Sequence, residues 1–141
     1  MQFLKKSDNI GLVKHLAIFD KSTVEKILSG EKTFEIRVSQ RRIPPFGQVQ
    51  TGDAVLVKVS GGKLIGQFQI GELCFFENPQ QKRLFWLKRN FAQQLCLPPN
   101  FWQERKGAKY FTLIKIATFS RFLTPPTNLK KRDRRGWVVL G

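Results

Sequence analysis

The spacing of apolar residues divides the N-terminal third of the chain into short elements. Residues 14–19, KHLAIF, form a compact apolar run that predicts a buried strand. Residues 20–30, DKSTVEKILSG, place apolar side chains at helical spacing and predict a short helix. Within it Ser22 and Glu25 have the spacing of a capping box, and Gly30 is typical of the position just after a helix.

The central part of the chain has the alternation of β structure. Residues 32–38, KTFEIRV, alternate between polar and apolar side chains and predict a strand. Residues 39–53 contain two prolines and two glycines, which predicts a long loop, and long ordered loops in a compact domain are often functional. Two apolar runs, 54–60 and 63–73, are separated by a pair of glycines and predict a hairpin.

The last third predicts one helix and two strands. Residues 80–95 have a helical apolar stripe and are followed by two prolines, which would stop a helix. Residues 109–122 and 137–140 are rich in β-branched and aromatic residues, as in strands. The apolar stripe of the predicted helix consists of Leu84, Leu87, Phe91 and Leu95.

Taken together, these elements predict an α+β fold. Five or six strands, mostly in hairpin order and flanked by two or three helices, favour a small mixed β-barrel over a parallel βαβ sheet. The 141 residues suit one domain. We expect that domain to span residues 12–141 and residues 1–11 to form a flexible N-terminal arm.

The large positive net charge of the chain indicates a negatively charged partner. There are 25 Lys and Arg against 10 Asp and Glu, a formal net charge of +15. Such an excess attracts polyanions, and together with the 12% aromatic content it favours RNA or single-stranded nucleic acid over an acidic membrane surface. A basic surface that only confers solubility, or one that binds an acidic protein, remains an alternative. The predicted phosphate contacts near the C-terminus are Lys130, Lys131, Arg132, Arg134 and Arg135.

Few residues support metal or cofactor chemistry. Cys74 and Cys96 have no metal-ligand spacing and are expected to be buried free thiols, and the single His15 is expected to pack or cap. Trp86 and Trp102 are expected to be packing residues. We therefore predict no cofactor and no metal. Without a signal peptide or a run of about 20 apolar residues, the sequence predicts a cytoplasmic protein.

The charged residues of the 32–38 strand form the main candidate site. Alternation along a strand places Thr33, Glu35 and Arg37 on one face, opposite the apolar residues. With Lys32 beside them, these groups could bind one ligand jointly: a lysine can act as nucleophile or base, and an arginine can hold a phosphate or a carbonyl oxygen. The alternative is an exposed strand face with a weak Glu–Arg pair, worth under about 1 kcal/mol.

Residues 30–37, GEKTFEIR, resemble the G-x-K-x-x-E-x-R signature of the ASCH (activating signal cointegrator homology) domain, a relative of the PUA RNA-binding fold. The order of the surrounding features is also similar, since Gly52-Asp53 opens a strand and the chain closes with KKRDRRGWVVL. The resemblance covers about residues 13–140. It implies a PUA-like barrel with a cleft between barrel and helices, lined by the motif, and an RNA-binding role.

The resemblance and the charge pattern together define the predicted site. The motif residues carried over as cleft residues are Lys32, Glu35 and Arg37, with Gly30 as the turn that lets Lys32 enter. Basic residues on the proline loop extend the set. The predicted ligand-binding residues, for RNA or for a nucleoside or nucleotide, are Lys32, Thr33, Glu35, Arg37, Arg41 and Arg42.

The resemblance also leaves an enzymatic alternative open. Some relatives are similar to amidohydrolases of N4-acetylcytidine, and others have been linked to RNA cleavage, for which Lys32 and Glu35 would be the catalytic pair. The amidohydrolase branch uses a lysine, a threonine three residues later and a distal glutamate. This sequence has Glu35 in place of the threonine and Gln94 near the distal position, which argues against that machinery. Three other acids remain candidates to complete the cleft: Glu72, Glu77 and Glu104.

Overall fold

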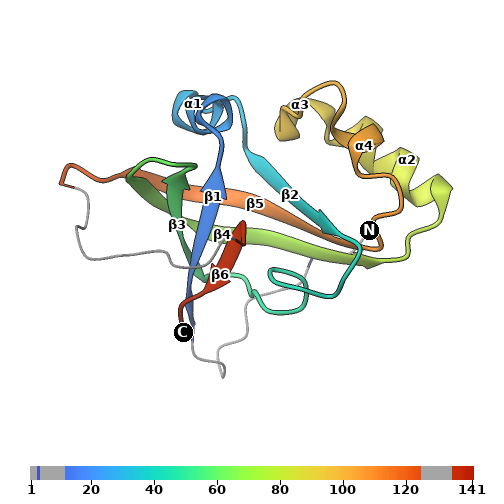
Figure 1. The fold of residues 1–141 in the computed structure, drawn as a ribbon, viewed down its shortest axis with the longest axis horizontal. Coiled ribbons are helices and arrows are strands. Elements are labelled where there is room, and N and C mark those ends of the chain that lie inside the picture. The colour runs from blue at the N-terminus through green and yellow to red at the C-terminus, as the bar shows by residue number, and fades with distance from the viewer. Residues whose placement is uncertain (1–2, 4–11, 125–134) are drawn as a thin grey trace.

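A six-stranded curled sheet forms the framework of the protein in a computed structural model (Figure 1), which describes residues 3, 12–124 and 135–141. Four helices accompany the sheet in the described part of the chain. The strands are β1 (Lys14–Phe19), β2 (Phe34–Ser39), β3 (Ala54–Val59), β4 (Leu64–Glu77), β5 (Tyr110–Arg121) and β6 (Trp137–Val139), and the helices are α1 (Lys21–Ser29), α2 (Gln81–Asn90), α3 (Ala92–Leu95) and α4 (Phe101–Glu104).

The strand order is β2-β5-β4-β3-β1-β6, so the second strand in sequence lies at one edge and the last strand at the other. All neighbours are antiparallel except β1 and β3, which are parallel. The sheet curls into a half-barrel, with α1 above one end and α2, α3 and α4 grouped beyond β2 (Figure 1). The predicted α+β fold with a curled, mixed sheet is confirmed.

Three apolar clusters pack on the sheet, and the two larger ones lie on opposite faces of it. The first lies inside the curl, where Val24 and Ile27 of α1 pack with Phe68, Ile70 and other buried residues of β1, β3 and β4. The second lies under α2, α3 and α4 and contains Phe34 and Ile36. The alternation correctly separated the apolar residues of β2 from its polar residues. The apolar face packs under the helices, and the polar residues lie on the opposite face.

The first helix begins two residues earlier than the capping-box spacing indicated. Asp20, and not Ser22, is the N-cap residue, and its Oδ1 accepts a hydrogen bond of 2.7 Å from the backbone N–H of Thr23. Asp is among the preferred N-cap residues, so the correct cap was available in the sequence. Gly30 ends the helix with φ of 82°, the left-handed conformation expected there.

The predicted helix at residues 80–95 is two helices, α2 and α3, that are separated at Phe91, whose φ is −115°. Leu87 and Leu95 are buried as expected, and Trp86 packs edge-on against Phe91, 5.9 Å between ring centres, while 40% of it stays exposed. Trp102 does pack, stacked on Phe111 in the second cluster. The short α4 was not predicted.

Some predictions fall outside the described residues. Of the proposed N-terminal arm, the structure describes only Phe3, which packs against the second apolar cluster. Four of the five predicted C-terminal phosphate contacts also lie outside the described ranges, namely Lys130, Lys131, Arg132 and Arg134.

None of the helices in the described ranges is long and apolar enough to cross a membrane.

Candidate functional site

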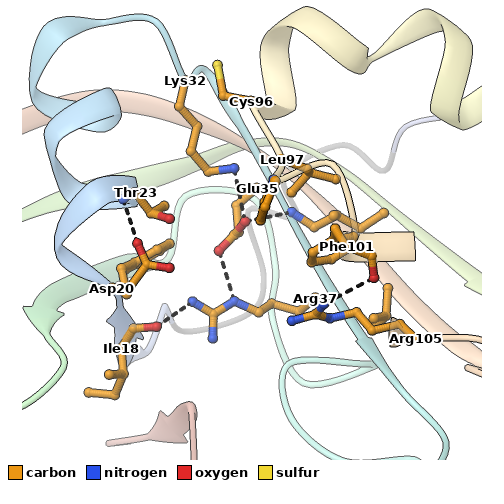
Figure 2. A pocket seen from close by; sticks show the side chains of 14 residues that line it. Ile18, Asp20, Thr23, Lys32, Glu35, Arg37, Cys96, Leu97, Phe101 and Arg105 are labelled. Carbon is orange, nitrogen blue, oxygen red and sulfur yellow. Dashed lines mark hydrogen bonds and ion pairs between the residues drawn. The ribbon is translucent and has the colours of Figure 1, made fainter. Parts of the chain in front are cut away.

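A cleft of about 330 Å³ opens between the start of α1 and the segment that joins α3 to α4. The end of β1 and β2 form its base, and Figure 2 shows charged side chains from both sides converging on it. Lys32, Glu35 and Arg37 all line the cleft. The structure thus brings together the three motif residues that the sequence singled out.

Lys32 enters the cleft directly after the turn at Gly30. Its backbone N–H bonds to the carbonyl of Lys26 at 3.0 Å, which directs the chain back from the end of α1. Only 3% of the residue is exposed. The Nζ donates to the carbonyl oxygen of Leu95 and lies 3.2 Å from Glu35 Oε1. Both contacts are donations to oxygen, as an ammonium group makes, and a third N–H remains on the group.

Glu35 connects the two cations. Its Oε1 accepts the backbone N–H of Ile36 at 3.0 Å, and its Oε2 accepts the Nε–H of Arg37 at 3.0 Å. Burial on its own would raise the pKa of Glu35, but the charges and hydrogen bonds of Lys32 and Arg37 outweigh burial and hold that pKa below its ordinary value. Glu35 is therefore a carboxylate at neutral pH whose two oxygens are already engaged.

Arg37 bridges the two ends of the curled sheet. Its Nη2 donates to the carbonyl of Ile18 on β1 at 2.8 Å, and its Nη1 donates to the carbonyl of Gly136, just before β6, at 3.1 Å. Its guanidinium lies 4.7 Å from the ring centre of Phe19 and 5.5 Å from that of Trp137. Among the described residues, Arg37 uses three of its five N–H groups: two in these bonds and one in the bond to Glu35.

Behind Arg37, a second polar cluster holds Trp137 in place. The indole N–H of Trp137 donates to His15 Nδ1 at 3.2 Å, so the His15 proton lies on Nε2, 2.7 Å from Asp53 Oδ2. Asp53 also accepts the backbone N–H groups of Val13 and Gln50, each at 3.1 Å. His15 is completely buried, which confirms its predicted packing role.

Three residues that sequence reasoning had not placed at the site also line the cleft: Asp20, Cys96 and Arg105. The Thr23 backbone N–H lowers the pKa of Asp20, with added contributions from the charges of Lys26 and Lys32. The N-cap position of Asp20 was the available signal. Arg105 lies 3.8 Å above the Phe101 ring centre, and no sequence pattern indicated it.

The other predicted ligand-binding residues lie away from the cleft. Thr33 is exposed, and its backbone N–H bonds to the carbonyl of Gln94 at 3.0 Å. Arg41 and Arg42 are exposed on the 39–53 loop. The Arg42 guanidinium lies 5.0 Å above the Phe46 ring.

The acids considered for completing the cleft are also placed elsewhere. Glu72 is exposed on β4, and Glu77 is 3.8 Å from Arg42 on the surface. Glu104 is exposed and does not line the cleft, and its Oε2 lies 3.8 Å from Arg105 Nη1. Gln94 contributes its backbone carbonyl to Thr33. The second carboxylate of the cleft is instead that of Asp20.

The cysteines are free thiols, as predicted, but only Cys74 is buried. Cys96 is half-buried at the rim of the cleft, so the expectation that both are buried was wrong for it. It follows α3 with φ of 50°, which turns the chain into the cleft wall. Within the described ranges, no group of three His, Cys, Asp or Glu side chains could hold a metal ion.

Comparison with known proteins identifies the fold. No family model and no curated protein matches the sequence. Among solved structures, an ASCH protein from Zymomonas mobilis aligns over 91% of this chain and 87% of its own, with a TM-score of 0.66 and 14% identity. Two variants of that protein give TM-scores of 0.67 and 0.68 at the same identity, over 90% and 88% of their chains. This chain has the PUA-like α+β fold of the ASCH domain.

Proposed function

We propose that the protein binds single-stranded RNA and seats one nucleotide in the cleft between α1 and α4. The observation that carries this proposal is the chain of ion pairs from buried Lys32 through buried Glu35 to half-buried Arg37, along the base of a cleft of about 330 Å³. Ligand pockets range from about 300 to 1,000 Å³, so the cleft has room for a nucleoside.

The cleft offers polar groups of both kinds to a base or sugar. The third N–H of Lys32 and the further N–H groups of Arg37 are donors, and the carboxylate of Asp20 is an acceptor. Phe101 and the Arg105 guanidinium, whose central carbon lies 3.8 Å above the Phe101 ring centre, form part of one wall. Fixed donors, an acceptor and a flat wall are the groups that recognise an unstacked base.

Basic and aromatic residues outside the cleft support a longer strand. On α2, Phe85 is 64% exposed and Trp86 is 40% exposed. Exposed aromatic rings among cations stack bases and contact phosphates without reading sequence. The neighbouring cations on this helix are Lys82, Arg83, Lys88 and Arg89. Arg135, the described member of the C-terminal basic run, is also exposed.

Hydrolysis of N4-acetylcytidine or of RNA is the weaker alternative. Its catalytic pair would be Lys32 and Glu35, but both Glu35 oxygens already accept hydrogen bonds and its lowered pKa disfavours a role as a proton donor near neutral pH. The geometry supports a positioning role for Glu35, which fixes the two cations that face the ligand.

Binding of a fluorescent single-stranded RNA, measured by anisotropy at several salt concentrations, tests the proposal. We expect the logarithm of affinity to fall linearly with the logarithm of salt concentration, with a slope of about −0.7 per phosphate contacted. Lys32→Met should weaken binding about tenfold or more at fixed salt. Lys115→Met is the matched control because it removes the same charge from an exposed position on β5, and it should change affinity less than about twofold.

A second variant guards against misfolding, because Lys32 is buried. Asp20→Asn keeps a good N-cap but removes the carboxylate from the cleft, so it should alter affinity while circular dichroism stays unchanged. The proposal fails if wild-type protein binds no RNA at low salt, or if Lys32→Met and Lys115→Met bind equally. Product formed from RNA or N4-acetylcytidine by wild type but not by Lys32→Met would favour the hydrolase instead.

A further inference from the structure

A second, smaller hollow lies on the other side of Arg37, toward the 39–53 loop. Its volume is about 140 Å³, and Arg37 and Val38 line both this hollow and the cleft. The other walls are mainly apolar and aromatic and include Pro45, Phe46, Tyr110 and Trp137. The proposed RNA-binding role of the first cleft does not use this hollow.

The residue that indicates a ligand in this hollow is Thr112. Thr112 lines the hollow, and only 1% of the residue is exposed. Its Oγ1 is buried and has no hydrogen-bond partner among the described residues. A buried hydroxyl without a partner costs about 1–3 kcal/mol, and native proteins contain few such groups. Thr112 pairs with Arg37 across β5 and β2, so the two side chains emerge on one face of the sheet.

The aromatic walls of the hollow are fixed in advance. The Phe46 ring lies 4.9 Å from Tyr110 and 5.2 Å from Phe75, in edge or tilted contacts. Trp137 is held by its hydrogen bond to His15. Rings held in this way can receive a planar group without losing further side-chain freedom, which favours binding.

We propose that this hollow is a second subsite that takes a pyrimidine base of the RNA whose neighbouring nucleotide occupies the first cleft. This inference rests on the proposed function of the cleft. An apolar cavity of about 150 Å³ holds a benzene ring, so a hollow of about 140 Å³ suits a single six-membered ring better than the two fused rings of a purine. The Thr112 hydroxyl bonds the polar edge of that base.

Arg37 then lies beneath the phosphate that joins the two nucleotides. It forms the boundary between cleft and hollow, and its side chain is 20% exposed. The bonds to Ile18, Gly136 and Glu35 fix the guanidinium, and the remaining N–H on each Nη is a donor for the phosphate oxygens. The ligand class is therefore a dinucleotide step with a pyrimidine on the loop side.

Calorimetric titration of the full chain with uridine monophosphate and with the dinucleotides UpU, UpA, ApU and ApA tests the subsite. We expect UpU to bind about tenfold or more tightly than the mononucleotide, and ApA to lose most of that gain. One of UpA and ApU should resemble UpU, because only one of the two positions selects a pyrimidine.

A matched pair of substitutions at Thr112 isolates the hydroxyl. Thr112→Val keeps the shape and should weaken UpU binding about two- to tenfold while leaving mononucleotide binding unchanged. Thr112→Ser keeps the hydroxyl and should bind UpU as the wild type does. Equal affinity of wild type and Thr112→Val for UpU, or equal affinity of wild type for UpU and ApA, overturns the subsite.

The two proposals fail in distinguishable ways. If the hollow holds only water, Thr112→Val leaves UpU affinity unchanged while Lys32→Met still weakens the mononucleotide, so the subsite alone is rejected. If wild type binds neither the mononucleotide nor any dinucleotide, both proposals are rejected.

Discussion

Two buried polar clusters meet at the indole of Trp137, and they differ in what their polar atoms leave for a ligand. In the cluster of Asp53, His15 and Trp137, the carboxylate accepts three hydrogen bonds and both ring nitrogens of His15 are engaged. In the cluster of Lys32, Glu35 and Arg37, the carboxylate is equally engaged, but the two cations retain N–H groups in a cleft.

The difference shows that burial of charge does not by itself mark a functional site. The first cluster uses its groups to secure backbone N–H groups and one indole, so its contribution is to stability. The second uses one carboxylate to fix two donors that face open space. A buried network with donors left over is the arrangement expected of a binding site.

The largest effect that should separate the clusters is that of Asp53→Ala. It leaves the N–H groups of Val13, Gln50 and His15 without their acceptor, so the free energy of unfolding should fall by about 3 kcal/mol or more. Asp20→Ala, which removes an exposed N-cap, should cost only about 0.5–2 kcal/mol. Urea denaturation measures both, and equal losses would contradict a structural role for the Asp53 cluster.

A smaller effect, dependent on pH, is expected for Glu35→Gln. The folded-state pKa of Glu35 lies below its ordinary value of 4.5, so its ionised form stabilises the fold above about pH 4.5. That contribution is lost as the pH falls from 4.5 through the folded-state pKa. At pH 7 the free energy of unfolding of the wild type should be about 1.5–3 kcal/mol larger than that of Glu35→Gln, and this difference should narrow below pH 4.5. A gap independent of pH in denaturation experiments would rule out this electrostatic role.

The smallest effect is expected for Gly136→Ala, which sharpens the comparison by disturbing Arg37 alone. A Cβ at residue 136 would lie 3.1 Å from Arg37 Nη1. We expect a stability change within about 0.5 kcal/mol but a measurable loss of RNA affinity. Gly62→Ala is the control, because its Cβ would be equally close to Val59, far from the cleft. Identical RNA affinities of the two variants would show that Arg37 does not contribute to binding.

Local pattern was sufficient to predict most of the fold. The alternation at residues 32–38 correctly separated Phe34 and Ile36 from Glu35 and Arg37, because the period of a strand fixes the face of each side chain. The hairpin of β3 and β4 was also found, although β4 runs on to Glu77. The break at Phe91 was missed because the apolar stripe continues through it.

The sequence predicted the residues that β2 contributes to the cleft, but not the wall formed by the segment between α3 and α4, because that wall depends on tertiary structure. Lys32 binds the carbonyl of Leu95, and Arg37 binds that of Gly136, 99 residues away. No periodicity encodes a bond to a distant backbone carbonyl. Arg105 and the orphan hydroxyl of Thr112 could be recognised only once the strands and helices were in place.

The placement of β6 makes the cleft sensitive to fraying of one sheet edge. This strand has three residues and pairs with β1. If it detaches locally, Arg37 loses the carbonyl of Gly136 and the ring of Trp137 but keeps its bonds to Glu35 and Ile18. Trp137, which is 2% exposed and anchored to His15, limits such opening more than the short ladder does. Hydrogen exchange at β6 therefore reports how often the guanidinium loses its contacts with Gly136 and Trp137.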